Sequence, residues 1–319
     1  MKFSNEFIPV ARENDPKMLD VAKRSGPIYC RDPFILPYHG RYYLYKTIDE
    51  SGIRAKGIEC LVSDDLQNWS APVTVFEAGE HFHGVGNFFW APECHFYKGH
   101  FYIFTSVRSK MHGGHRTISA YRADNPLGPF EDIANGCITP GGWDAIDGTL
   151  YIDRGGRPWM VFVHEWTSMP DKIGGMAAAR LSDDFTKLIS EPILLFSARD
   201  AGWATRGVTD GPFLYRMDDG TLYMLWSNFC DNGYAIGLAK SDSGEIDGTW
   251  TQEGLLYKKG LRPSFTLDGG HGMVFKTFEG EIMLAFHSPN APSEEDGSER
   301  LVVKKLTEQD GKLQIERYK

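Results

Sequence analysis

Long apolar runs are missing from this chain of 319 residues. No stretch approaches the roughly 18 consecutive apolar residues that a membrane-spanning helix needs, so a membrane is not a predicted partner. The opening residues, MKFSNEFIPVAREN, are too polar for the apolar segment of a signal peptide. We therefore expect a cytoplasmic protein.

Paired cysteines are missing as well. No C-x-x-C pair occurs, so the sequence predicts neither a disulfide framework nor a structural zinc site. We expect free thiols that pack as small hydrophobic side chains. The five cysteines are scattered along the chain: Cys30, Cys60, Cys94, Cys137 and Cys230.

Basic side chains are too few and too dispersed for a nucleic-acid-binding protein. The chain has 34 Lys+Arg against 43 Asp+Glu, a formal net charge of −9, and no long basic stretch. Binding to a phosphate backbone requires clustered Lys and Arg. Nucleic acid is therefore excluded as the main partner, and a neutral or cationic ligand fits this charge better.

Several common catalytic motifs are also absent. The chain has no G-x-S-x-G nucleophile elbow, no P-loop and no complete Rossmann G-x-G-x-x-G. No long stretch shows helical periodicity either. The missing motifs leave carboxylate side chains as the candidate catalytic groups, and the missing helical periodicity favours a fold built of strands.

Five similar segments do occupy the chain. Each has a short apolar run, a glycine-containing turn and an aromatic-rich apolar run, which is the pattern of a β-hairpin. They begin 56 to 63 residues apart, at positions 32, 91, 147, 210 and 271. The segments are DPFILPYHGRYYLYKT, APECHFYKGHFYIFTS, DGTLYIDRGGRPWMVFV, DGPFLYRMDDGTLYMLWS and HGMVFKTFEGEIMLAFH.

This regular repeat predicts an all-β protein, a five-bladed β-propeller. We expect residues 1–319 to form one catalytic domain with blades starting near 32, 91, 147, 210 and 271. A pair of β-sandwiches would explain the strands but not the constant period. Four tryptophans fall within strand patterns and are expected in the core: Trp69, Trp159, Trp226 and Trp250.

The first residues of the five segments are expected to converge at one mouth of the central channel. They are Asp32, Ala91, Asp147, Asp210 and His271. Three carboxylates at matching repeat positions are expensive to bury, so packing alone does not explain them. Cleavage of a glycosidic bond needs such a set, because one carboxyl protonates the leaving oxygen and another activates water or attacks the sugar.

The motifs at these positions resemble glycoside hydrolase family 43, whose five-bladed enzymes act on arabinose-, xylose- or galactose-containing oligosaccharides. The resemblance covers roughly Arg31 to His287. Each motif is short, and the five occur in the family's order at blade spacing. They are Arg31-Asp32-Pro33, Trp90-Ala91-Pro92-Glu93, Ile146-Asp147, Thr209-Asp210-Gly211-Pro212 and Gly270-His271-Gly272.

The resemblance implies an inverting glycosidase with an oligosaccharide substrate. Asp32 would be the general base, Asp210 the general acid, and Asp147 the residue that tunes the pKa of the acid. No cofactor would take part in the chemistry. In the family, the fifth-blade histidine, here His271, often holds a hydrated calcium or other cation in the channel.

The fourth-blade motif departs from the family pattern, which normally has Glu where this chain has Asp210. The side chain is one methylene shorter, and a misplacement of about 1 Å can cost on the order of a hundredfold in rate. Three interpretations follow: Asp210 is the general acid in a reshaped site, another acid such as Glu93 takes over that role, or catalysis is lost.

Two alternative functions remain open. A sugar-binding propeller with decayed catalysis would explain the change from Glu to Asp, but three retained acids argue against it. A retaining, fructan-type propeller hydrolase is similar in its Arg31-Asp32 and Glu93-Cys94 pairs. Its nucleophile motif would have to be Asn14-Asp15-Pro16, which lies too close to Asp32 for a separate blade.

Aromatic side chains near the channel mouth are candidates for stacking against sugar rings. Phe89 and Trp90 precede the second inner strand, and Trp143 precedes the third. Glu93 and Arg206 are the polar candidates for substrate contacts.

Two groups of histidines are candidate metal ligands: His81 with His83, and His112 with His115. Zinc usually needs three or four ligands, so we interpret them as solvated loop residues.

Overall fold

The computed structural model describes residues 28–48, 57–84, 88–134, 136–231, 233–258, 268–289 and 299–316. Asn14-Asp15-Pro16, on which the fructan-type alternative depends, lies outside these residues.

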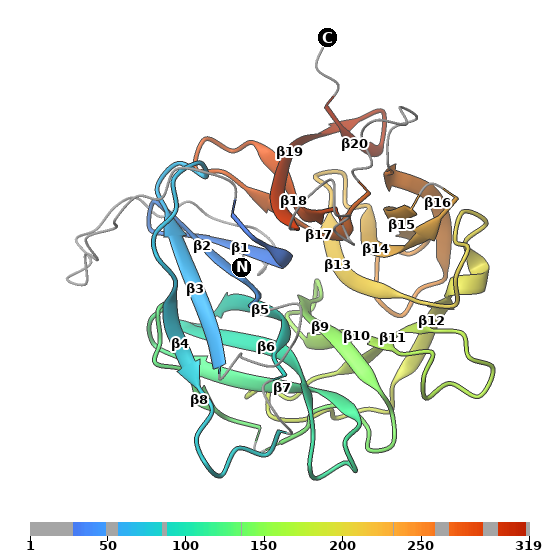
Figure 1. Ribbon diagram of the computed structural model, residues 1–319. Coiled ribbons are helices and arrows are strands. Elements are labelled where there is room, and N and C mark those ends of the chain that lie inside the picture. Colours follow the sequence, from blue (N-terminus) through green and yellow to red (C-terminus); the bar gives the residue numbers. More distant parts are fainter. Residues whose placement is uncertain are drawn as a thin grey trace.

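Five four-stranded antiparallel sheets are arranged around a common centre (Figure 1). The prediction of a five-bladed β-propeller is confirmed. The innermost strands are β1, β5, β9, β13 and β17. In chain order the blades comprise β1 (Arg31–Tyr38), β2 (Arg41–Thr47), β3 (Gly57–Ser63) and β4 (Val73–Glu77); β5 (Trp90–Tyr97), β6 (His100–Arg108), β7 (Arg116–Ala123) and β8 (Glu131–Asp132); β9 (Ala145–Ile152), β10 (Pro158–His164), β11 (Gly175–Arg180) and β12 (Ile193–Ser197); β13 (Asp210–Arg216), β14 (Leu222–Cys230), β15 (Gly233–Ser241) and β16 (Trp250–Tyr257); β17 (Gly270–Lys276), β18 (Ile282–Ser288), β19 (Arg300–Gln309) and β20 (Lys312–Ile315).

One short 3-10 turn, η1 (Ala198–Asp200), follows β12. No helix in the described part of the chain is long and apolar enough to cross a membrane.

The core lies between neighbouring blades, where the sheet faces bury aromatic and aliphatic side chains. One cluster joins blades 3 and 4, and another joins blades 2 and 3. Trp69, Trp159, Trp226 and Trp250 are all buried, as predicted. Full burial of a large apolar side chain contributes about 1.5–3 kcal/mol, so these contacts hold the blades together. All five cysteines are free thiols, which confirms that prediction too.

A β-bulge interrupts every innermost strand close to its start. In each blade the register with the second strand shifts after one paired residue near the start, which is the first paired residue of the strand except in blade 3, where Ala145 pairs before Ile146. We call those paired residues the pre-bulge ring: Arg31, Trp90, Ile146, Asp210 and Gly270. The next residue of each strand has a positive φ between 44° and 55°, and these residues form the bulge ring: Asp32, Ala91, Asp147, Gly211 and His271.

The structure corrects one member of the predicted set of equivalent residues. Asp210 pairs directly with Ser227 and belongs to the pre-bulge ring, one residue ahead of the position expected from the repeat. Gly211 takes the place in the bulge ring. A Cβ atom on Gly211 would lie 2.8 Å from Cγ of His271 and 3.0 Å from its Cα, so glycine is required for His271 to fit.

The N–H groups of the bulge ring hydrogen-bond mainly to side chains of the preceding blade. Asp32 donates to His287 Nδ1 (3.2 Å) and Ala91 to Thr47 Oγ1 (2.9 Å). The remaining two such bonds run from Asp147 to Ser106 Oγ (2.9 Å) and from His271 to Ser227 Oγ (2.8 Å).

Gly211 is the exception in this pattern. The preceding blade offers Val163 at the matching position, paired with Ile146, and valine cannot accept a hydrogen bond. The N–H of Gly211 donates instead to the carboxylate of Asp147 (2.9 Å). Because Val163 has no hydroxyl group, the carboxylate of Asp147 accepts this hydrogen bond and links blade 3 to the backbone of blade 4.

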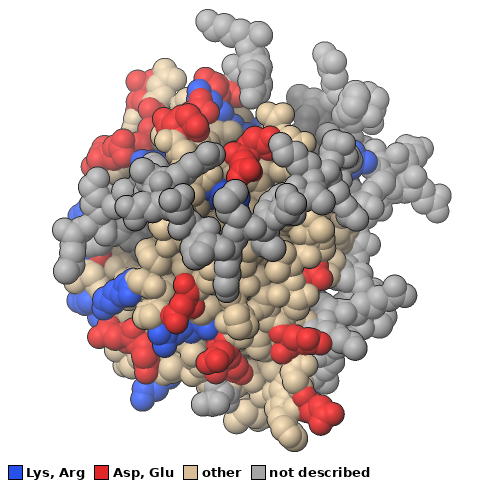
Figure 2. Space-filling model, turned by 90° about the vertical axis from the view of Figure 1, so that its left-hand side faces the viewer, with Lys and Arg blue, Asp and Glu red and all other residues tan. Residues whose placement is uncertain are grey.

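The side of the molecule that faces the viewer in Figure 2 carries acidic and basic side chains interspersed with one another. The exclusion of nucleic acid stays a prediction.

Loss of one of these acceptors should destabilise the fold. Ser227 is fully buried, so Ser227→Ala leaves the N–H of His271 unpaired, at a cost of about 1–3 kcal/mol in the free energy of unfolding. Ser190→Ala removes a similar bond to the N–H of Arg180 at an exposed position, where water replaces it. Urea denaturation of both variants checks this, and equal losses would contradict it.

Candidate active site

Both rings lie at the starts of the innermost strands, so they gather side chains from five blades at one end of the channel. His271 Nδ1 lies 3.2 Å from Asp32 Oδ1 and 3.8 Å from Asp147 Oδ2. The structure therefore brings together residues that are 239 positions apart in the sequence (271 − 32). All three side chains are buried or nearly so.

Asp32 is held as a carboxylate. Thr47 Oγ1 donates a hydrogen bond to its Oδ2 (2.8 Å), and Arg31 Nε lies 3.8 Å from the same oxygen. Burial alone would raise the pKa of Asp32, but the charge and hydrogen bond of His271, together with Arg31 and His287, hold it well below its usual range. Asp32 is therefore ionised across the physiological pH range and can accept a proton.

Asp210 has the opposite character. Burial and the negative charge of Asp147 raise the pKa of Asp210 to about 7, although a hydrogen bond from Tyr234 Oη (3.0 Å) favours the ionised form. Burial raises the pKa of Asp147 as well, and His271 opposes the rise. Because the two carboxyls interact, the pair takes up a proton as the pH falls through about 7, the pKa of Asp210.

His271 supplies the positive charge of the site. Burial would lower its pKa, yet Asp32 and Asp147 raise it to about 9, so the imidazole is protonated at neutral pH. Among the described residues no cluster of three or more His, Cys, Asp or Glu side chains has the arrangement of a metal site. The hydrated cation in the channel near His271 stays a prediction.

The predicted substrate contacts have different surroundings. The ring of Phe89 is 2% exposed and packs against Phe76 and Phe82 at centroid distances of 5.8 and 5.2 Å. This corrects the prediction, because Phe89 is a core residue. Trp90 belongs to the pre-bulge ring, is partly exposed and packs against Phe88.

Trp143 and Arg206 remain available to a substrate. Trp143 is partly exposed, and His164 stacks on it at 3.7 Å. Arg206 is exposed, and its guanidinium lies over the ring of Phe229 at 3.8 Å. These contacts fix the orientation of both side chains, and their binding role stays a prediction.

Glu93 lies deeper in the channel than predicted for a substrate contact. It follows the bulge on β5, is 6% exposed and hydrogen-bonds to His95 Nε2 (3.0 Å). Its negative charge raises the pKa values of Asp147 and His271. This placement favours an electrostatic role over direct contact with a sugar.

Sequence reasoning missed the residues that surround the acids. Thr47, Ser106, Ser227 and His287 are the final letters of four of the five repeated segments, so the repeat itself contained the signal. Tyr234, the partner of Asp210, lies on β15 and had no comparable signal. Glu165 and Trp166 follow β10, and Trp166 is 40% exposed.

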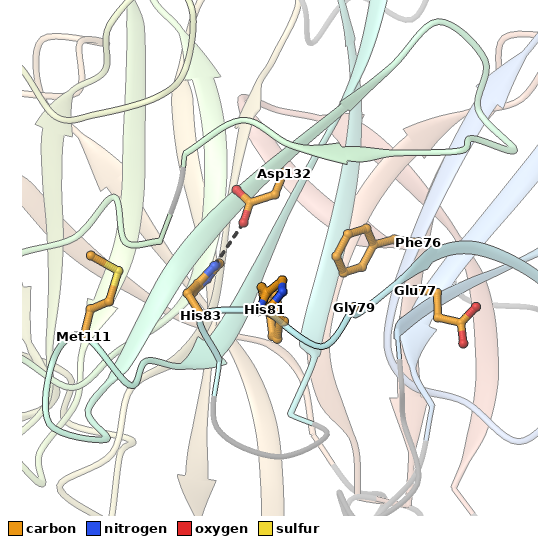
Figure 3. Close-up of a pocket in the computed structure, with 8 residues that line it drawn as sticks. Phe76, Glu77, Gly79, His81, His83, Met111 and Asp132 are labelled. Carbon is orange, nitrogen blue, oxygen red and sulfur yellow. Dashed lines mark ion pairs between the residues drawn. The ribbon is translucent and has the colours of Figure 1, made fainter.

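A separate cavity of about 430 Å³ lies beside blade 2. His83 and Asp132 point toward each other in it and form an ion pair of 3.0 Å (Figure 3). His81 and Met111 also line the cavity. The interpretation of these histidines as solvated is wrong for His83, whose side chain is 9% exposed and pairs with a carboxylate of β8, and the absence of a metal there stays a prediction.

The match to a known protein family covers nearly the same residues as the five blades. Residues 27–313 match the family model described as Glycosyl hydrolases family 43. The chain belongs to glycosyl hydrolase family 43. Members of this family are glycosidases, so the protein is an enzyme of carbohydrate hydrolysis and its substrate is a carbohydrate.

Several relatives act on arabinose- or xylose-containing polymers according to their names. The crystal structure of an endo-arabinase from Bacteroides thetaiotaomicron is 38% identical, with a TM-score of 0.77, over 90% of this chain and 99% of that one. An endo-1,4-β-xylanase structure from the same organism is 25% identical, with a TM-score of 0.73, over 94% and 97%. The extracellular exo-α-(1→5)-L-arabinofuranosidase ArbA of Cellvibrio japonicus is 25% identical over 82% of this chain and 79% of its own length.

The opposite protonation states of Asp32 and Asp210 predict a pH profile. Activity requires an ionised base and a protonated acid, so kcat/KM should stay high below neutral pH and fall as the pH rises through about 7, the pKa of Asp210. The profile should be measured on an oligosaccharide, whose leaving oxygen needs a proton. A kcat/KM that increases between pH 7 and 9 would contradict this assignment.

Proposed function

We propose that this family 43 enzyme hydrolyses α-L-arabinofuranosyl linkages in arabinan-type oligosaccharides with inversion of configuration. The observation that supports the chemistry most directly is the pairing of a carboxylate kept ionised, Asp32, with a carboxyl kept protonated, Asp210. Acid–base cleavage of a glycoside needs these two states at once. The sugar is proposed from the named activities of two relatives, the endo-arabinase and the exo-arabinofuranosidase.

In this scheme Asp32 removes a proton from water, and the resulting hydroxide adds to the anomeric carbon. Asp210 donates its proton to the glycosidic oxygen as the carbon–oxygen bond breaks. The products are a sugar of inverted configuration and a free alcohol. Asp32 then returns its proton to solvent and Asp210 regains one.

Asp147 acts on this cycle through charge. Its carboxylate faces the imidazolium of His271 and accepts the N–H of Gly211, the residue that follows Asp210. The contact fixes the start of β13 relative to blade 3. The negative charge of Asp147 also keeps the proton on Asp210.

A panel of 4-nitrophenyl glycosides and short oligosaccharides identifies the sugar. We expect turnover of the α-L-arabinofuranoside and of α-1,5-linked arabino-oligosaccharides, with weaker or no turnover of the β-xyloside and the galactofuranoside. Preference for the xyloside would overturn the proposed sugar. Binding of arabino-oligosaccharides in calorimetry without any turnover would favour the sugar-binding alternative.

Asp32→Asn tests the base. Water activation is needed whatever the leaving group, so kcat/KM should fall by about 10²–10⁴ on both the nitrophenyl glycoside and the oligosaccharide. The substitution is isosteric, and a thermal unfolding scan checks that the variant is folded. A loss confined to the oligosaccharide would show that Asp32 serves the leaving group rather than the water.

A further inference from the structure

Tyr234 contacts the candidate general acid, and the scheme above gives it no role. It lies on β15 of blade 4, and its hydroxyl donates a hydrogen bond of 3.0 Å to Oδ2 of Asp210 at the start of β13. Strand β14 lies between these two strands, so the tyrosine side chain extends over it to reach the carboxyl. In the part of the chain that the structure describes, no other group donates a hydrogen bond to this carboxyl. The position of the Asp210 carboxyl therefore depends on Tyr234.

The side chain of Tyr234 is itself fixed from several sides. It is 4% exposed, and its ring stacks with that of His287 at a centroid distance of 5.9 Å. Its backbone N–H donates to Asp268 Oδ2 (3.1 Å), and its carbonyl accepts the N–H of Gly269 (3.1 Å). A Cβ atom on Gly270 would lie 2.4 Å from Tyr234 Cε1, so the ring packs directly against the start of β17. Blade 5 therefore fixes the place from which the hydroxyl reaches Asp210.

The hydroxyl of Tyr234 is a permanent donor. Burial and the negative charges of Asp210 and Asp32 raise the pKa of Tyr234 well above its usual value, so the phenol keeps its proton. A neutral phenol has one proton to donate, and Tyr234 gives it to Oδ2 of Asp210. A carboxylic acid accepts a hydrogen bond best at its carbonyl oxygen, so the proton of Asp210 itself is on Oδ1.

Resting on the proposed function, we propose that Tyr234 is a positioning residue for the general acid. Its hydroxyl fixes the Asp210 carboxyl with Oδ1 as the oxygen that carries the proton, and it stabilises the carboxylate that remains after the proton has left. Asp210 is one methylene shorter than the Glu usual in the family, and a misplacement of about 1 Å can cost on the order of a hundredfold in rate. A short acid with a fixed partner avoids that loss.

The hydrogen bond from Tyr234 gains strength during the reaction. Asp210 gives its Oδ1 proton to the glycosidic oxygen as the carbon–oxygen bond breaks, and a negative charge then develops near Asp147, which disfavours it. A hydrogen bond to an ionised acceptor is about twice as strong as one between neutral groups. An interaction that becomes stronger as the proton leaves lowers the barrier of this step. Solvent later returns the proton to Asp210.

Other charges act on Asp210 from neighbouring blades. The negative charges of Asp147 and Asp32 raise its pKa, whereas His271 and the hydrogen bond from Tyr234 lower it. Two further charged groups interact with Asp210 over longer distances, Arg31 on β1 and Glu165 after β10. Tyr234 differs from all of these groups because it contacts the carboxyl through a hydrogen bond.

Tyr234→Phe tests the proposal, because it removes the hydroxyl and keeps the ring. On an α-1,5-linked arabino-oligosaccharide, kcat should fall by about 10–10²-fold, the equivalent of one hydrogen bond to a charged group. An aryl arabinofuranoside with a very acidic phenol needs no proton on its leaving oxygen, so its kcat should stay within about threefold of wild type. The alkaline limb of the oligosaccharide profile should move to higher pH, since loss of this hydrogen bond raises the pKa of Asp210 further above its usual value.

Tyr215→Phe is the matched control. Tyr215 is similarly buried, lies near the other end of β13 from Asp210, and donates its hydroxyl proton to Glu308 Oε1 (2.6 Å). This variant loses an equivalent hydrogen bond away from the site, so its kinetics should be those of wild type. Retained turnover of the aryl glycoside shows that Tyr234→Phe is folded, and thermal unfolding of both variants supports this independently.

A double variant shows whether Tyr234 acts through Asp210. If it does, Asp210→Asn with Tyr234→Phe should be no slower on the oligosaccharide than Asp210→Asn alone, because the two losses are not additive. Multiplied losses would overturn the proposal, and so would an unmoved alkaline limb or an equal loss of Tyr234→Phe on both substrates. Each of these results leaves the proposed function intact, whereas full activity of Asp32→Asn would remove it.

Discussion

The backbone bulge at the start of each innermost strand is the constraint on which the site depends. At the bulge one residue of each blade has a left-handed backbone conformation. The N–H group of that residue has no hydrogen-bond partner within the blade. A buried N–H group without a partner costs about 1–3 kcal/mol, so the preceding blade has to supply an acceptor. Thr47, Ser106, Ser227 and His287 do so, and the acceptors hold neighbouring blades at a fixed distance. The side chains at the channel mouth are therefore positioned by hydrogen bonds that the fold itself requires.

Blade 4 departs from this pattern, and the departure creates the contact between the candidate acid and its modulator. Val163 offers no acceptor, so the N–H of Gly211 turns to Asp147. Because Gly211 lacks a side chain, His271 can pack against it and place its imidazolium between two aspartates. One positive charge among three carboxyls cannot neutralise them all. The proton that compensates the remainder resides on Asp210, whereas His271 and Arg31 favour the ionised form of Asp32.

Much of this could be predicted from the sequence, because the repeat period is long and regular. The five hairpins predicted the propeller, and their first residues predicted that Asp32, Asp147 and His271 would meet. The repeat places Asp210 at the bulge position, one residue away from where the structure has it, because either residue of Asp210-Gly211 can be aligned with that position. Only the strand pairing shows that Gly211 is the bulge residue. The position of Phe89 and Trp90 just before the second inner strand predicts that both lie at the mouth, whereas neighbouring residues point to opposite sides and Phe89 points into the core. Tyr234, the hydrogen-bond partner of Asp210, lies on β15, and no repeat in the sequence marks that position.

The stereochemistry of the reaction tests the roles of Asp32 and Asp210 most directly, and time-resolved ¹H NMR of an α-L-arabinofuranoside during hydrolysis measures it. An ionised base that activates water, opposite a protonated acid, predicts that the β-anomer of arabinose appears first and that the α-anomer grows in only by mutarotation. First appearance of the α-anomer would mean that a carboxylate attacks the sugar directly. In that case the assignment of Asp32 as a base toward water would be contradicted.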